Sequence, residues 1–341
     1  MGAVVALLAV SAGCSGLPTG SDGGVQSSPA LDSVPAGADV VGYVDVQGAL
    51  GDDAVRTVLN ESIALSSRSS MDEDAPDTLA AAIAEAENES ELDLSAFASV
   101  TFYGRTNTTG DASYSAAVLS TGWAESDLVA AMENDSTYSL EETTYEGQTL
   151  YEPTGGSETV VAGEDLGSWV GVLGDGSYVV GSESAVKDAL DVSAGNADRL
   201  SGDLRTAFED TGDGYLRYAV AVPQEEFDAG QVSPGMNTDV FNDVTLVSGS
   251  LYTEGEDISL ETTLTFQSDS AAGDARDVLK GAVTTYRGLV EDNQTKQLLS
   301  EEHLTVEADG STVVVTSTNS ADDVVSILEK LYGSPMAGPG V

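Results

Sequence analysis

The strongest constraint on the fold is an internal repeat. The stretches SWVGVLGDGSYVVGSESAVKDAL (168–190) and EEHLTVEADGSTVVVTSTNSADDVVSIL (301–328) both have the pattern of strand, Asp-Gly turn, strand, serine cap and helix. Their Asp-Gly-Ser turns coincide at residues 175–177 and 309–311. Such self-similarity predicts one supersecondary unit that the chain uses twice.

The repeat extends toward the N-terminus. Residues 97–132 and residues 243–279 each have the pattern of a hairpin followed by a helix. The apolar strand ADVVGYVDVQ (38–47) corresponds to GYLRYAVAVPQ (214–224). Each half therefore has the order strand, hairpin, helix, hairpin, helix. We also expect a connecting helix near 198–212 and, in the first half only, helices near 52–66 and 77–89 and strands near 137–152.

This pattern predicts an α+β fold with two related halves. Hairpins imply antiparallel pairing, and we expect each half to be a mainly antiparallel sheet with helices on one face. The expected boundaries are 35–197 for the first repeat and 198–332 for the second, followed by a disordered tail at 333–341. The pattern leaves open whether the halves share one sheet or form two domains.

The segments GSYVVGSESAVKDAL and GYLRYAVAVP carry a resemblance to a family. With the repeat around them, they resemble a group of uncharacterised secreted haloarchaeal lipoproteins that have no assigned activity. The resemblance covers most of the chain after residue 35 and implies a location and a fold. It implies no substrate, cofactor or catalytic residue.

Cys14 is the only cysteine of the chain, and it follows the apolar run MGAVVALLAVSAG. The arrangement resembles the lipobox of prokaryotic lipoproteins, in which cleavage leaves the cysteine as a lipid-bearing N-terminus. We therefore expect a signal peptide at 1–13 and a lipid anchor with a flexible Gly/Ser/Pro-rich tether at 14–34. The basic n-region is missing and Ser11 stands where a lipobox has Leu, which suggests a start codon assigned too late. The alternative is a buried cysteine behind an apolar helix.

The anchor would be the only membrane contact that the sequence predicts. After Cys14, no segment approaches the run of about 18 apolar residues that a transmembrane helix needs. We expect the folded body to lie at the outer face of the cell membrane, held through a lipid on Cys14.

The charge of the chain is extreme. The sequence has 58 Asp and Glu against 12 Lys and Arg, a formal net charge of -46, and the acidic residues are spread along the whole chain. At 1 M salt the Debye length is about 3 Å, so concentrated salt would screen the self-repulsion of such a surface. The composition is typical of a halophilic archaeon. Nucleic acid is excluded as a direct partner because phosphate binding needs clustered Lys and Arg.

Five asparagines lie in N-x-S/T sequons, which are acceptor sites for glycans on exported proteins. These candidate glycosylation sites are Asn60, Asn88, Asn107, Asn134 and Asn293.

The catalytic motifs in the sequence are weak. His303 is the only histidine, and we expect it at the exposed start of a strand. Ser184 and Lys187 have the S-x-x-K spacing that lets a lysine activate a serine nucleophile, and STN (317–319) imitates the second element of such sites. No K-T-G motif and no G-x-S-x-G motif accompanies them. Ser184 also has a simpler explanation near the N-terminus of a helix.

Metal and cofactor sites are not expected. The acidic loops DEDAPD (72–77) and EDTGDG (209–214) lack EF-hand spacing, and no glycine motif for nucleotides is present. The tyrosines that fall within strand patterns are expected to be sheet residues and not a ligand cage: Tyr43, Tyr103, Tyr178, Tyr218 and Tyr252.

Three functions follow from these observations. The first is a non-enzymatic, lipid-anchored surface protein that binds an envelope protein or a small ligand. The second is a solute-binding lipoprotein of a transporter, although such proteins usually consist of parallel βαβ units. The third is a serine hydrolase or penicillin-interactive protein that uses Ser184 and Lys187. The sequence leaves the oligomeric state open.

Overall fold

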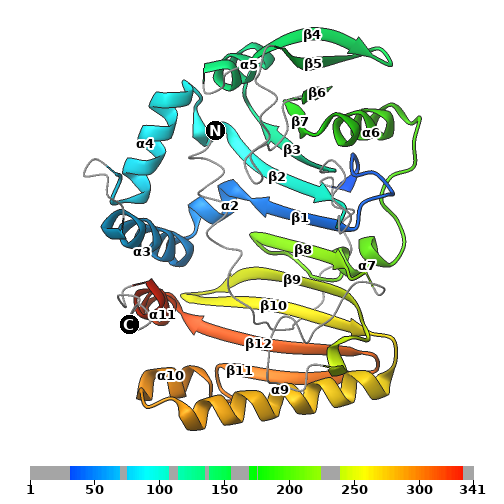
Figure 1. The fold of residues 1–341 in the computed structure, drawn as a ribbon. Helices are drawn as coiled ribbons and strands as arrows, with labels where there is room; N and C mark the ends of the chain where they lie inside the picture. Colours follow the sequence, from blue (N-terminus) through cyan, green and yellow to red (C-terminus); the bar gives the residue numbers. More distant parts are fainter. Residues whose placement is uncertain are drawn as a thin grey trace, which may run out of the picture.

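The expected hairpins pair into one large sheet. A computed structural model describes residues 31–69, 75–106, 114–134, 138–154, 169–174, 176–223 and 239–332. The fold is α+β. Its twelve described strands form a single sheet in the order β11-β12-β10-β9-β8-β1-β2-β3-β7-β6-β5-β4, with every pairing antiparallel (Figure 1). Cys14, Asn107, Asp175 and the tail at 333–341 lie outside the described residues.

The strands match the expected segments, including the extra pair near 137–152. Their bounds are β1 Val40–Asp45, β2 Phe97–Gly104, β3 Ser115–Thr121, β4 Ser139–Tyr145, β5 Gln148–Thr154, β6 Trp169–Gly174, β7 Ser177–Gly181, β8 Leu216–Ala221, β9 Val244–Glu254, β10 Asp257–Phe266, β11 Leu304–Asp309 and β12 Thr312–Ser320.

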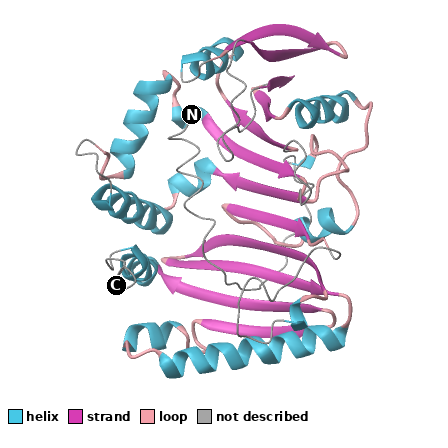
Figure 2. Cartoon of the chain, in the orientation of Figure 1, coloured by secondary structure: helices cyan, strands magenta, loops and turns pink. Residues whose placement is uncertain are grey.

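The helices surround the sheet, and the long helix α9 lies beside β11 (Figure 2). Their bounds are α2 Val46–Gly51, α3 Asp53–Ser69, α4 Leu79–Ser90, α5 Glu125–Asn134, α6 Glu183–Ala194, α7 Asp203–Glu209, α9 Asp269–Leu289, α10 Asn293–Leu298 and α11 Ala321–Tyr332, with short 3-10 turns η2 Leu94–Ala96 and η3 Asp239–Phe241. The sequence pattern missed α2 and α10, each of which has six residues and is too short for a periodic signal.

The centre of the sheet is the pair β1 and β8. Val40 to Val44 pair with Val220 to Leu216, so the strand that opens the first expected repeat lies beside the strand that opens the second. The sheet therefore continues without interruption from one expected half to the other. We refer to β1 to β7 as the N-terminal half of the sheet and to β8 to β12 as the C-terminal half.

Local sequence signals explain where elements begin and turn. In the hairpin β11–β12, Gly310 has a φ of 55°, and in the hairpin β6–β7, Gly176 has a φ of 76°. Both lie in the left-handed region that favours glycine. Ser320 caps α11: its hydroxyl accepts the N–H of Asp323 at 3.2 Å and donates to the Asp323 carboxylate at 2.8 Å.

The expectation that helices cover one face of the sheet is wrong for the N-terminal half. Tyr103, Ala116 and Val179 form one core with α6 and α7, and the alternate residues Val100, Leu119 and Val180 form another with α5. Because side chains alternate between faces along a strand, these two cores lie on opposite sides. The physical reason is that the strands are apolar at both alternations, as in SYVVG of β7, and therefore bury both faces.

The C-terminal half has one apolar face. Phe266, Val306 and Val313 pack against Ala272 and Ala275 of α9. The opposite face carries polar side chains. Ser250, Glu261 and Thr316 are cross-strand partners in one row, and Ser259 and Thr318 form the neighbouring pair.

The folded body begins earlier than expected. Leu31 and Val34, which the sequence pattern placed at the end of the tether, are fully buried in the core of the N-terminal half. Pro35 forms a bridge with Arg199, and Leu200 donates its N–H to the Val34 carbonyl at 2.7 Å. These contacts attach residues 31–38 to the segment between α6 and α7.

Candidate functional site

A pocket of about 420 Å³ lies between the C-terminal half of α9 and the edge strand β11. Its walls come from α9, from the connection between α10 and β11, and from β11 itself. The lining residues are Lys280, Val283, Thr284 and Arg287, then Leu299 and Glu301, then Leu304, Thr305, Val306 and Glu307.

Helix α9 presents one face to the pocket. Its four lining residues are spaced by three, one and three positions, which places them on the same side of a helix. Ser268 caps the helix by accepting the N–H of Ala271 at 3.2 Å. The fully buried residues of α9, Ala272 and Ala275, lie in its first two turns. The N-terminal part of the helix thus fixes it to the sheet, and the C-terminal part forms the pocket wall.

The opposite wall is held by α10 and the start of β11. Asp292 caps α10 by accepting the N–H of Thr295 at 2.8 Å, and Lys330 of α11 donates to Asp292 at 2.7 Å. These hydrogen bonds, first that from Lys330, lower the pKa of the Asp292 carboxyl well below its usual range. The Ser300 carbonyl accepts the N–H groups of His303 and Leu304. That turn places Leu299 and Glu301 at the pocket.

His303 has a structural position next to this wall. Its ring Nδ1 lies 3.0 Å from the carbonyl oxygen of Thr318 in β12, and its own carbonyl accepts the Thr318 N–H at 3.0 Å. The residue is partly buried and holds the start of β11 to its neighbour strand. His303 thus lies directly before the strand, as expected, but it is partly buried and not exposed.

The pocket carries two cations that have no ion-pair partner within the described residues. Lys280 and Arg287 take part in none of the ion pairs there, whereas Arg276 of the same helix pairs with Asp277 at 2.7 Å. The carboxylates of Glu301 and Glu307 also line the pocket, and both residues are exposed. The site therefore combines separate cationic, anionic and apolar groups.

The segment that carries Leu299 and Glu301 also contains a buried hydroxyl. Ser300 Oγ has no hydrogen-bond partner within the described residues, and Ser300 itself is not among the residues that line the pocket. Buried polar groups in native proteins usually have a partner, so an unsatisfied one needs an explanation, such as a missing water or ion.

Sequence reasoning missed this pocket, although one signal could have indicated it. No Asp or Glu occurs between Asp277 and Glu291, and this acid-free run contains Lys280 and Arg287. In a chain with 58 acidic residues, an acid-free stretch on a surface helix is unusual. The run also carries the exposed side chains of Tyr286 and Leu289.

The S-x-x-K pair does not form a nucleophile with its activating base. Lys187 donates to the Glu183 carboxylate one turn earlier, and its ammonium lies 4.9 Å from the centre of the Trp169 ring and 5.5 Å from that of Tyr145. Ser184 is exposed at the second position of α6. The STN element lies in β12, and six strands separate β12 from β7 in the sheet. The structure therefore does not bring the two elements together.

The tyrosines within strand patterns are sheet residues, as expected. The hydroxyl of Tyr103 donates to the Ala185 carbonyl at 2.8 Å, and that of Tyr178 donates to the Trp123 carbonyl at 2.9 Å. Burial and nearby carboxylates raise the pKa of both hydroxyls, so both stay neutral donors. These tyrosines fasten helix and loop backbone to the sheet.

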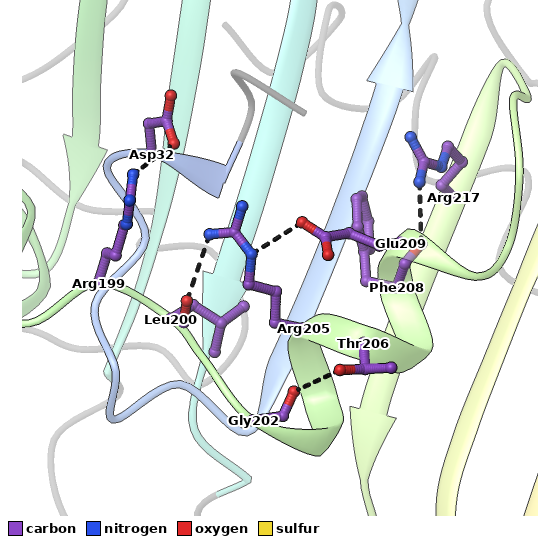
Figure 3. A network of polar contacts seen from close by, with 9 residues as sticks. All are labelled: Asp32, Arg199, Leu200, Gly202, Arg205, Thr206, Phe208, Glu209 and Arg217. Atoms are coloured by element: carbon purple, nitrogen blue, oxygen red, sulfur yellow. Dashed lines mark hydrogen bonds and ion pairs between the residues drawn. The ribbon is translucent and has the colours of Figure 1, made fainter. Parts of the chain in front are cut away.

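A second group of charged residues surrounds α7, where three arginines bind backbone and carboxylates (Figure 3). Arg199 pairs with Asp32 at 3.1 Å, and Arg205 pairs with Glu209 at 2.8 Å. Arg217 donates to the Phe208 carbonyl at 2.9 Å and stacks 4.5 Å from the Phe208 ring. Burial lowers the pKa of the Arg217 guanidinium. Each arginine has structural partners, and Arg217 is the one that attaches β8 to α7.

Most of the glycosylation candidates are accessible. Asn88, Asn134 and Asn293 are exposed. Asn60 is partly buried, and its side-chain oxygen accepts the N–H of Leu79 at 2.8 Å, which attaches α4 to α3.

Within the described residues, no group of three or more His, Cys, Asp or Glu side chains could hold a metal ion. The acidic stretch 209–214 is described, and Glu209 there pairs with Arg205; residues 72–74 of the other acidic loop lie outside the description. None of the described helices is both long enough and apolar enough to span a membrane.

No protein-family model and no curated protein matches the chain. Among solved structures, it is similar to TP0453 in several crystal forms. Crystal form III is 12% identical with a TM-score of 0.48, covering 88% of this chain and 97% of that chain. Crystal form IV is 13% identical with a TM-score of 0.46 (87% and 95% covered), and crystal form I is 15% identical with a TM-score of 0.44 (90% and 98% covered). At these values the likeness does not extend to an activity or a ligand.

Proposed function

We propose that the protein is a non-enzymatic, lipid-anchored binding protein at the outer face of the cell membrane of a halophilic archaeon, and that the pocket between α9 and β11 is its ligand site. The observation that carries the binding role is the pocket itself. Its volume of about 420 Å³ falls within the range of about 300–1,000 Å³ that is usual for small-molecule sites. The lipobox-like context of Cys14 and the net charge of -46 support the location.

Two observations favour this function over the alternatives. A transporter-type solute-binding protein would close two lobes around its ligand, whereas β1 and β8 join both halves into one sheet. A serine hydrolase would need Lys187 to face Ser184, whereas Lys187 donates to Glu183.

The proposed body also consists of two related halves. The support is the strand order outward from the central pair: β1-β2-β3-β7-β6 in one direction and β8-β9-β10-β12-β11 in the other. Each series consists of one strand, one hairpin and then a second hairpin whose strands lie in reverse order. The sequence repeat predicts the strand and the two hairpins, but not the reversal. Strands β4 and β5 extend the N-terminal half only.

The anchor is tested by mass spectrometry of the protein from native membranes. We expect a mature N-terminus at Cys14 that carries a lipid mass, and release of the Cys14→Ser variant from the membrane fraction. An unmodified Cys14 in wild-type protein would contradict the anchored location.

The binding role is tested at Thr284, which lines the pocket, against its exposed neighbour Thr285, which does not. Native mass spectrometry of wild-type protein from its own membranes is expected to detect a bound small molecule. The Thr284→Trp variant, whose indole fills the pocket, should lose the molecule, and the control Thr285→Trp should retain it. Equal retention in both variants would place the ligand elsewhere.

A further inference from the structure

We infer that the pocket between α9 and β11 takes an organic anion with one charged group, a carboxylate, sulfonate or phosphodiester, attached to an apolar body. The inference rests on the proposed function, because it names the ligand class of the same pocket. Three features of the lining carry it: the cations of α9, the apolar floor and the flanking glutamates.

The cations indicate the sign of the ligand's charge. Acidic residues outnumber basic ones 58 to 12, so a cation on the surface of this chain has many potential partners. Lys280 and Arg287 nevertheless have no ion-pair partner within the described residues. They lie two helical turns apart on one face of α9, with the Thr284 hydroxyl between them. The planar guanidinium of Arg287 suits a carboxylate, sulfonate or phosphate, which it can bind through two parallel hydrogen bonds.

The apolar floor indicates the body of the ligand. Val283, Leu299, Leu304 and Val306 line the same pocket, and Val306 is buried within the core that α9 covers. Contact with such side chains is favourable in proportion to the apolar surface that it removes from water. An inorganic anion would leave this surface unused.

The glutamates limit the charge of the ligand. Glu301 and Glu307 line the pocket from its opposite wall, and both are exposed. A second negative charge on the ligand would lie near them and be repelled. In concentrated salt, where the Debye length is about 3 Å, only direct contacts keep their electrostatic strength. Affinity then depends on the contact ion pairs at Lys280 and Arg287 together with apolar burial.

The test compares two fluorescent probes of nearly the same shape in concentrated KCl. 8-Anilinonaphthalene-1-sulfonate carries the anionic group, and N-phenyl-1-naphthylamine lacks it. We expect the sulfonate to bind with a Kd about ten-fold lower than the neutral probe, as a charge-assisted contact predicts. The double variant Lys280→Gln/Arg287→Gln should lose this preference. Arg276→Gln/Lys296→Gln removes the same charge from α9 and α10 outside the pocket lining and should keep it.

Two further measurements sharpen the ligand class. Glu307→Gln should strengthen binding of the sulfonate probe, because it removes a like charge from the pocket. 1-Octanesulfonate should displace the probe, and methanesulfonate and inorganic phosphate at equal concentration should not. Circular dichroism of each variant checks that the fold is retained.

The outcomes separate this inference from the proposed function. Both probes could bind with equal affinity that Lys280→Gln/Arg287→Gln does not change and Thr284→Trp abolishes. This result would contradict the requirement for an anionic group and would support the pocket as a ligand site. Displacement by methanesulfonate as effectively as by 1-octanesulfonate would overturn the apolar body. Binding of neither probe would overturn both the inference and the pocket as a ligand site.

The same chemistry occurs in free amphiphiles and in the head groups of membrane lipids. Pelleting of the unlipidated Cys14→Ser protein with phosphatidylglycerol vesicles, lost in Lys280→Gln/Arg287→Gln, would identify a membrane lipid as the source. Displacement of the probe by 1-octanesulfonate without pelleting would identify a free anion.

Discussion

The two halves of the sheet bury their strands in different ways. In the N-terminal half, cores form on both faces, with α6 and α7 on one side and α5 on the other. In the C-terminal half, one core forms beneath α9, and the opposite face carries Ser250, Glu261 and Thr316 side by side. One continuous sheet thus has apolar cores on both faces in one half and on one face in the other.

The difference indicates a division of roles. The half that is apolar on both faces has its helices packed on buried strands. Charged side chains there make structural contacts, such as those of Arg105 with the Gly37 carbonyl and of Lys187 with Glu183. The half with one apolar face has a long helix whose C-terminal part carries no buried residue, and this part forms the pocket. Stability is therefore expected to concentrate in the N-terminal half, and ligand binding in the C-terminal half.

The largest expected effect tests this difference in stability. Leu190 of α6 is fully buried in the N-terminal half, and Leu264 of β10 is a partly buried residue beside the core of the C-terminal half. Leu190→Ala should lower the free energy of unfolding by about 3–5 kcal/mol, because it creates a cavity, and Leu264→Ala by about 1–2 kcal/mol. Guanidinium-induced unfolding in concentrated KCl measures both.

The control for these variants is Leu289→Ala, since the Leu289 side chain is 75% exposed. It should change the free energy of unfolding by less than about 0.5 kcal/mol. Equal losses for Leu190→Ala and Leu264→Ala would remove the difference between the halves.

The sequence predicted the local parts of this fold better than its faces. Asp-Gly turns and the serine cap of α11 are encoded within a few residues, so these hairpins and this helix start were predictable. Ser182 precedes α6 as expected but makes no side-chain cap hydrogen bond. Which helix covers which face depends on contacts between distant segments, such as Leu190 of α6 with the core around Tyr103. A strand that is apolar at both alternations does indicate two buried faces, and SYVVG of β7 contained that signal.

The second prediction concerns the polar face of the C-terminal half. Burial raises the pKa of the Glu261 carboxyl to about 7, above its ordinary value of 4.5. Because the folded protein holds this proton more tightly than the unfolded chain, the free energy of unfolding falls as the pH rises from about 4.5 to about 7 and then levels off. The Glu261→Gln variant has no carboxyl group at this position, so its free energy of unfolding should not fall for this reason over that pH range.

Relative to wild type, Glu261→Gln should therefore gain nothing near pH 4 and about 1–2 kcal/mol at pH 8, after allowance for the partly exposed position. Denaturant unfolding at both pH values measures the difference. Glu307→Gln, an exposed glutamate of β11, is the matched control for the lost charge and should stay within about 0.5 kcal/mol at both. A destabilised Glu261→Gln at pH 8 would show that the carboxylate has a partner on this face.

The third prediction concerns a contact that joins the two halves. Asp52, just before α3, accepts the hydroxyl of Thr253 at 2.8 Å and that of Tyr215 at 3.1 Å. Burial alone would raise the pKa of this carboxyl, but the hydrogen bonds, first that from the Val55 N–H, lower it overall. The carboxylate therefore stabilises the fold fully at pH values above its ordinary pKa of 3.8, and this stabilisation is lost as the pH falls through the lowered pKa.

Asp52→Ala should lower the free energy of unfolding by about 1 kcal/mol at neutral pH, because it removes these hydrogen bonds. Asp53→Ala is the neighbouring control, because the Asp53 side chain is 99% exposed and its pair with Arg56 lies on the surface. The control should cost less than about 0.5 kcal/mol. If both variants lose the same free energy, the contact between the halves has no measurable role in stability.

The candidate site was the part least predictable from sequence. The S-x-x-K spacing does place Ser184 and Lys187 on the same side of α6, but it cannot predict that Glu183 and the ring of Trp169 attract the ammonium. The pocket lies between α9 and β11, and the residues of either wall alone do not predict a pocket. Unpaired cations in an acidic chain are visible only after the ion pairs are known.

The smallest expected effect concerns Ser184 and Lys187 and tests the hydrolase alternative. The pair between Lys187 and Glu183 is partly exposed, so Lys187→Gln should cost no more than about 0.5 kcal/mol, including the contact with the Trp169 ring. Ser184→Ala should be neutral within about the same limit. A fluorophosphonate probe is expected to leave Ser184 unlabelled, since no base activates its hydroxyl. Labelling of wild type that disappears in both Ser184→Ala and Lys187→Gln would overturn the non-enzymatic proposal. It would also place the functional site in the N-terminal half, on α6.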